Sequence, residues 1–98
     1  MLRHAAHPGE VLKEELDELG ITPTELARQI DVPANRLSQI INGKRSVTGD
    51  TALRLGHWFN NNPQFWMNLQ AQFELASAER TAGDSIQDLP TRTKMQQA

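Results

Sequence analysis

The stretch of sequence that decides the fold runs from Thr22 to Arg45 and reads TPTELARQIDVPANRLSQIINGKR. It holds two segments with apolar residues at helical spacing, which predict helices over residues 23–30 and 33–42. Only two residues, one of them Asp31, separate these segments, and so short a connection forces the helices to cross sharply. We expect Asp31 to adopt a positive φ, which aspartate tolerates better than most residues other than glycine. The stretch therefore predicts a helix-turn-helix motif.

Capping residues and prolines mark where further helices begin. Thr22 and Glu25 have the spacing of a capping box, and Thr48 and Asn62 are suitable N-caps further along the chain. Proline stands where a helix could begin at four places, because its fixed φ is already helical. Gly20 follows an apolar-periodic segment, as Gly43 does, and both suit the left-handed position after a helix. The predicted helices are 8–19, 23–30, 33–42, 49–60 and 63–79.

Each predicted helix has an apolar stripe, and together the stripes predict one core. The aromatic side chains Trp58, Phe59, Phe65 and Trp66 flank the turn at residues 60–62, where we expect much of the burial energy. The predicted core residues are Val11, Leu12, Leu16, Leu19, Leu26, Ala27, Ile30, Leu37, Ile40, Ile41, Ala52, Leu55, Phe59, Phe65, Leu69, Phe73 and Ala76.

The length of the chain indicates one domain, and the five predicted helices, without any strand-like alternation, make it compact and all-α. The chain has 98 residues, no cysteine and a net charge of −2, and no apolar run is long enough to span a membrane. We expect a helix-turn-helix domain over residues 7–79, followed by a polar, mobile tail over residues 80–98. The sequence begins without the apolar core of a signal peptide, which favours a cytoplasmic location.

The charge is distributed unevenly along the chain. Residues 1–19 hold five acidic and two basic residues, whereas residues 20–60 hold five basic and three acidic ones. The net charge of −2 therefore describes the whole surface and does not exclude one basic face. The helix-turn-helix is the basic part of the chain.

The outward face of the 33–42 helix carries side chains that read base edges. Amides pair with adenine and a guanidinium with guanine, and this face contains no lysine or glutamate, the usual solvating residues. We predict a recognition helix whose base-reading residues are Asn35, Arg36, Ser38, Gln39 and Asn42. Phosphate contacts would come from the preceding helix and the following turn, through Thr24, Arg28, Lys44, Arg45 and Ser46.

Two further surfaces suggest protein partners. The 63–79 helix carries a second apolar set opposite its core stripe, which predicts a dimer interface through Met67, Ala71, Leu75 and Ala78; alternatively, this set covers its own domain or packs under the tail. The first helix carries an acidic set that could bind a basic partner or simply be solvated: Glu10, Glu14, Asp17 and Glu18.

The stretch from Thr22 to Arg45 resembles the Xre or phage-repressor-like helix-turn-helix family, and three further motifs more narrowly resemble the bacterial HigA-type antitoxins. They are HPGE at residues 7–10, TALRL at 51–55 and PQFWMNLQ at 63–70, in addition to the 22–45 stretch. The family commonly has glycine where this chain has Asp31. The resemblance implies a dimeric repressor of its own operon that binds operator DNA and neutralises a HigB-type toxin, a ribosome-dependent mRNA endonuclease.

Other functional classes find little support in the sequence. His4, His7 and His57 lack metal-ligand spacing, and no catalytic grouping or glycine-rich phosphate loop can be placed, so we expect neither an enzyme nor a cofactor, metal or small-molecule substrate. We expect His7 to lie next to an N-cap and His57 to be exposed. A stand-alone repressor without a toxin is the alternative function. A pure protein adaptor would not require the amide-rich face.

Overall fold

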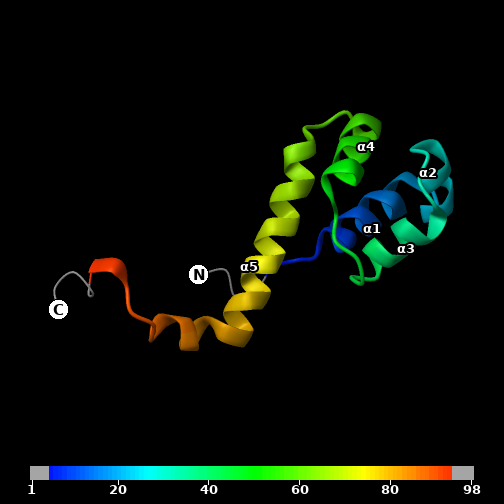
Figure 1. The fold of residues 1–98 in the computed structure, drawn as a ribbon. Helices are drawn as coiled ribbons and strands as arrows, with labels where there is room; N and C mark the ends of the chain where they lie inside the picture. Colours follow the sequence, from blue (N-terminus) through cyan, green and yellow to red (C-terminus); the bar gives the residue numbers. More distant parts are fainter. Residues whose placement is uncertain (1–4, 94–98) are drawn as a thin grey trace.

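The computed structural model describes residues 5–93, and this part of the chain contains five helices and no strand. The helices are α1 (Pro8–Leu19), α2 (Pro23–Gln29), α3 (Ala34–Ile41), α4 (Gly49–Phe59) and α5 (Pro63–Gln87). Helices α1 to α4 gather at one end of the molecule, and α5 packs beside α4 and then extends away (Figure 1). The predicted all-α class is confirmed. The predicted helix starts are also confirmed, each to within one residue.

The predicted caps form as expected at three helices. The side chains of Thr22, Thr48 and Asn62 accept hydrogen bonds from backbone N–H groups in the first turns of α2, α4 and α5. The capping box at α2 is only half formed, because the Glu25 carboxylate accepts hydrogen bonds from Arg28 and Gln29 instead of reaching back to Thr22. These caps explain why the helix starts could be predicted so closely.

His7 is itself the N-cap of α1, which corrects the prediction that it would only neighbour one. Its Nδ1 accepts a hydrogen bond from the Gly9 N–H at 2.9 Å, and its own N–H donates to Glu10 at 3.0 Å. The ring is buried and meets Phe73 edge-on at 4.7 Å between ring centroids. His7 therefore connects the start of α1 to α5.

Acid should weaken the fold through His7. Burial lowers the pKa of His7 from 6.5, although the charge on Glu10 partly opposes the shift. Because the folded-state pKa is the lower one, this contribution to the free energy of unfolding is present above pH 6.5 and is lost as the pH falls below it. Urea titrations on either side of that pH should show the loss. His7→Asn, which caps a helix without titrating, should remove this part of the pH dependence; an unchanged profile would contradict the assignment.

The buried core contains most of the predicted residues. Leu12, Leu16, Leu26, Leu37 and Leu55 are essentially inaccessible, and apolar residues of α5 complete the cluster. As expected, the aromatic rings around the α4–α5 turn contact one another, with centroids 4.8–5.5 Å apart.

The prediction of burial in the core is wrong for two residues. Leu19, at the end of α1, is 54% exposed, and Phe65 is 44% exposed. Trp66 and Gln70 are buried where Phe65 was expected, while the predicted burial of Ala76 is confirmed. The larger ring occupies the interior because its burial removes more apolar surface from water. Phe65 instead packs on Trp66 with the two rings nearly perpendicular and their centroids 5.1 Å apart.

Helix α5 ends at Gln87, eight residues beyond the predicted helix end at residue 79, so residues 80–87, which were assigned to the tail, are helical. Residues 94–98 of the predicted tail lie outside the described residues. The added turns have no apolar periodicity strong enough to predict a helix. The Thr81 hydroxyl donates to the carbonyls of Ser77 and Ala78, a pattern that bends helices. Figure 1 shows a bend in this part of α5.

Gly9 brings α1 into direct contact with the backbone of α3. A Cβ atom at Gly9 would lie 1.9 Å from the Ile40 carbonyl oxygen and 2.8 Å from the Ile41 Cα. Only glycine allows the two helices to approach this closely. The position of α3 relative to the rest of the domain therefore depends on this contact.

Candidate nucleic-acid interface

The turn between α2 and α3 has the predicted tight geometry. Asp31 has a φ of 60°, and the Val32 N–H donates to the Ala27 carbonyl at 3.0 Å, so the chain reverses within two residues. Leu26 and Ala27 on α2 are buried together with Leu37 on α3, which holds the two helices in their crossing. This geometry presents the opposite face of α3 to solvent.

The outward face of α3 is polar and accessible, as predicted. Asn35 and Ser38 are exposed, and so is Asn42, which caps the end of the helix. The other two candidate base-reading residues are half-buried and have partners within the protein. Gln39 accepts a hydrogen bond from the Arg45 Nε at 2.7 Å, and Arg36 forms an ion pair with Asp50 on α4 at 3.1 Å. The face thus combines three exposed polar side chains with two side chains that are engaged within the protein.

The candidate phosphate-contacting residues occupy two places. Arg45 and Ser46, in the turn after α3, line a hollow of about 270 Å³ together with Arg36. Lys44 is exposed in the same turn. Thr24 and Arg28 are exposed on α2, where Arg28 pairs with Glu25. The structure therefore brings Arg36 on α3 together with Arg45 and Ser46 in the following turn, while Thr24 and Arg28 lie on α2.

Glu25 is the acidic partner within the α2 pair. Hydrogen bonds from Arg28 and then Gln29 lower the pKa of Glu25 to about 2. The carboxylate is therefore ionised at neutral pH and engages Arg28 in the absence of DNA. An approaching phosphate has to compete with this carboxylate for the guanidinium.

Sequence reasoning missed the role of Asp50 and Arg54 at this surface. Asp50 accepts hydrogen bonds from both Arg36 and Arg54, and the pKa of Asp50 is lowered, chiefly by the hydrogen bond from Arg54. The spacing of Asp50 and Arg54 on one helix could have predicted their pairing. Nothing in the sequence could have predicted that Arg36, which lies on another helix, also pairs with Asp50.

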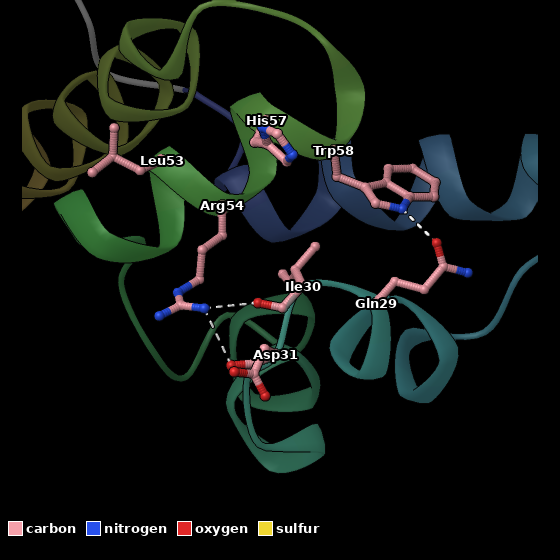
Figure 2. Close-up of a pocket in the computed structure, with 7 residues that line it drawn as sticks. All are labelled: Gln29, Ile30, Asp31, Leu53, Arg54, His57 and Trp58. Carbon is pink, nitrogen blue, oxygen red and sulfur yellow. Dashed lines mark hydrogen bonds between the residues drawn. The ribbon is translucent and has the colours of Figure 1, made fainter.

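A second hollow lies between α2 and α4. It measures about 290 Å³ and is bordered by the exposed Leu53 and by Trp58, whose indole N–H donates to the Gln29 side chain at 2.7 Å (Figure 2).

Within residues 5–93 no three His, Cys, Asp or Glu residues are grouped so that they could hold a metal ion. No helix in this range is long and apolar enough to cross a membrane.

Comparison with known families agrees with this geometry. A profile described as "Helix-turn-helix" matches residues 12–64, which include α2, the turn and α3. The chain belongs to the helix-turn-helix family. The predicted resemblance to the HigA-type antitoxins within this family is confirmed by similar solved structures.

One solved relative is an addiction module antidote protein of the HigA family from Coxiella burnetii. It is 42% identical, with a TM-score of 0.88, and the match covers 90% of this chain and 97% of the relative. Another is the Pseudomonas aeruginosa antitoxin HigA with the higBA promoter, which is 38% identical, has a TM-score of 0.86 and is matched over 91% of this chain and 99% of its own. An Escherichia coli relative named as an uncharacterised HTH-type transcriptional regulator is 36% identical over 76% of this chain and 79% of its own length.

Proposed function

We propose that this protein is a cytoplasmic, DNA-binding antitoxin that represses its own operon. In this proposal a homodimer places α3 of each subunit in the major groove of operator DNA, and the protein also neutralises a HigB-type, ribosome-dependent mRNA endonuclease. The observation that carries DNA binding is the exposed amide and hydroxyl face of α3 behind a tight turn. The promoter complex of the Pseudomonas aeruginosa relative supports it.

Footprinting on the DNA upstream of the protein's own gene tests this proposal directly. We expect protection of two half-sites about 34 Å apart, on one face of the duplex. Adding the product of the neighbouring gene should alter the footprint if that product is a toxin. Absence of any protected site would contradict DNA-binding autoregulation.

Base-reading and phosphate-contacting residues should behave differently on substitution. Gln39→Ala should cost about 1–3 kcal/mol of discrimination at one base pair, because the amide is proposed to face a base edge. Arg28→Ala should weaken binding to all sequences and reduce the salt slope by about 1. Salt titrations with the operator and with its single-pair variants measure both effects. Identical behaviour of the two variants would contradict this division of roles.

The outward side of α5 supports the homodimer. Ala71 and Ala78 are exposed, Leu75 is 58% exposed, and Ile86 continues this set into the added turns of the helix. Leu75 and Ile86 line the same hollow of about 240 Å³. Met67 is half-buried against the core of its own domain, so we leave it out of the proposed interface.

The acidic face of α1 is the proposed contact for a basic toxin. Glu10, Glu14, Asp17 and Glu18 are all exposed, although Asp17 pairs with Lys13 at 2.9 Å and Glu10 also caps the helix. Reversing Glu14 and Asp17 together to lysine should lower toxin affinity at least tenfold, because complementary charge at this face becomes repulsion. Isothermal titration with the purified toxin measures the change. Unchanged affinity would leave this face with a solvating role only.

A stand-alone repressor is the second candidate function. The similarity to a relative named only as a transcriptional regulator favours it. Both candidates share the α3 surface, so DNA binding does not separate them. Co-purification with the product of an adjacent short, basic reading frame would favour the antitoxin, and the lack of such a frame would favour the repressor.

A further inference from the structure

An exposed carboxylate lies within the surface that we propose contacts DNA. Asp50, in the first turn of α4, borders the same hollow as Arg36 and Arg45. A negative charge at this place repels DNA phosphates and weakens binding to every sequence. Despite this repulsion, Asp50 has a role at this surface, because it accepts hydrogen bonds from two arginines.

Asp50 joins two arginines that come from different elements. Its Oδ2 accepts hydrogen bonds from the Arg36 Nη1 on α3 at 3.1 Å and from the Arg54 Nε on α4 at 3.0 Å. This contact holds the Arg36 guanidinium beside the first turn of α4, at the hollow that Arg36, Arg45 and Asp50 line together. The recognition helix and α4 are connected at this point.

Arg54 is anchored at its other end to the helix-turn-helix turn. Its Nη1 donates to the carbonyl oxygens of Ile30 at 2.9 Å and of Asp31 at 3.3 Å (Figure 2). Arg54 cannot rotate away from Asp50 without giving up these hydrogen bonds. One continuous set of hydrogen bonds therefore runs from the turn through Arg54 and Asp50 to Arg36.

The effect of these contacts is on orientation more than on stability. The side chains of Arg36, Arg54 and Asp50 are 30%, 38% and 56% exposed. Ion pairs at such exposure contribute little to folding, because water competes for both partners and salt screens them. A long arginine held in one arrangement, however, loses less conformational freedom when it binds.

We propose that Asp50, held by Arg54, is a positioning residue for DNA recognition that restricts the orientation of Arg36 and so sharpens the choice of one base pair. The inference rests on the proposed function, in which α3 reads the operator. The repulsion between Asp50 and the phosphates lowers affinity for all sequences equally and leaves selectivity unchanged, so any change of preference has to come from the orientation of Arg36.

A second acidic–basic pair on the same protein provides a matched control. Glu25 engages Arg28 on α2 as Asp50 engages Arg36. Asp50→Asn and Glu25→Gln each remove one carboxylate charge and weaken the hold on one arginine. Of these two arginines, Arg36 is proposed to face a base and Arg28 a phosphate, so of the two variants only D50N should change sequence preference.

Selection from a randomised duplex DNA library, followed by sequencing, measures these preferences whatever the operator sequence is. We expect D50N to lose about threefold to tenfold preference at one base pair, the cost of ordering one long side chain, with the other positions retained. Glu25→Gln should bind every sequence more tightly and keep all preferences. Arg54→Met should show the same loss of preference at one position as D50N. If circular dichroism shows that D50N is unfolded, Arg54→Met takes its place in the test.

Three outcomes would overturn the inference. D50N that keeps every preference and gains affinity uniformly would show that Asp50 acts through its charge alone. A loss at the same position in Glu25→Gln would show that the effect does not depend on Arg36. If the wild-type protein enriches no sequence at all, the proposed function fails, and the inference fails with it.

Discussion

Gly9→Ala should lower the free energy of unfolding by about 3 kcal/mol or more, at or beyond the upper end of typical overpacking costs. The added Cβ would lie 1.9 Å from the Ile40 carbonyl oxygen, 2.7 Å from its carbon and 2.8 Å from the Ile41 Cα, all closer than the 3.0 Å that real Cβ atoms keep. These are backbone atoms of α3, so no side-chain rotation relieves the clash. Helix α1 would have to move away from the recognition helix, and DNA binding would fall with the fold.

Another glycine of the chain provides the control. An added Cβ at Gly49, in the first turn of α4, would meet no atom within 4 Å beyond its chain neighbours and the backbone of its own helix, so Gly49→Ala should leave stability unchanged or raise it slightly. Urea unfolding followed by circular dichroism compares the two variants. If Gly9→Ala lost no more stability than Gly49→Ala, α1 and α3 could not lie as close together as described.

Leu75→Asp should break the proposed homodimer. An interface with twofold symmetry uses each residue twice, so the substitution removes two buried leucines and buries two charges. Losing about 1.5–3 kcal/mol per leucine corresponds to at least a hundredfold weaker dimerisation. Sedimentation equilibrium measures the dissociation constant. Operator affinity should fall as well, because a monomer contacts one half-site only.

Leu53→Asp is the matched control for the dimer. Leu53 is 63% exposed, close to the 58% of Leu75, but it lies on α4 beside the α2–α4 hollow. Its substitution should leave the dimer intact. A Leu75→Asp protein that still sedimented as a dimer would place the interface elsewhere, whereas dissociation of both variants would point to a general loss of structure.

The helix starts and the tight turn could be predicted because their causes are local. Thr22, Thr48 and Asn62 satisfy N–H groups two or three residues away, and Asp31 tolerates its left-handed conformation whatever surrounds it. The outward face of α3 followed from helical periodicity alone once Leu37 and Ile40 were assigned to the core. These parts of the candidate site needed no long-range information.

The predictions were wrong where the local sequence allowed more than one structure. Phe65 and Trp66 are neighbours that could each face inward, and only packing against Phe59 and the rest of the core selected Trp66. The end of α5 was placed too early because its last turns lack an apolar stripe. A helix can continue past its apolar residues when nothing in the sequence breaks it, and Gly83 alone did not break this one.

The sequence by itself determined the five helices, the sharp crossing of α2 and α3 and the amide-rich face, because capping, turn conformation and helical periodicity act over a few residues. Tertiary structure alone decided that Gly9 lies against the backbone of α3 and that Asp50 and Arg54 hold Arg36. The contacts of Gly9 with α3 and of Asp50 with Arg36 join residues 14 or more positions apart. They exist only after the core has set how the helices cross, and no spacing along the chain records them.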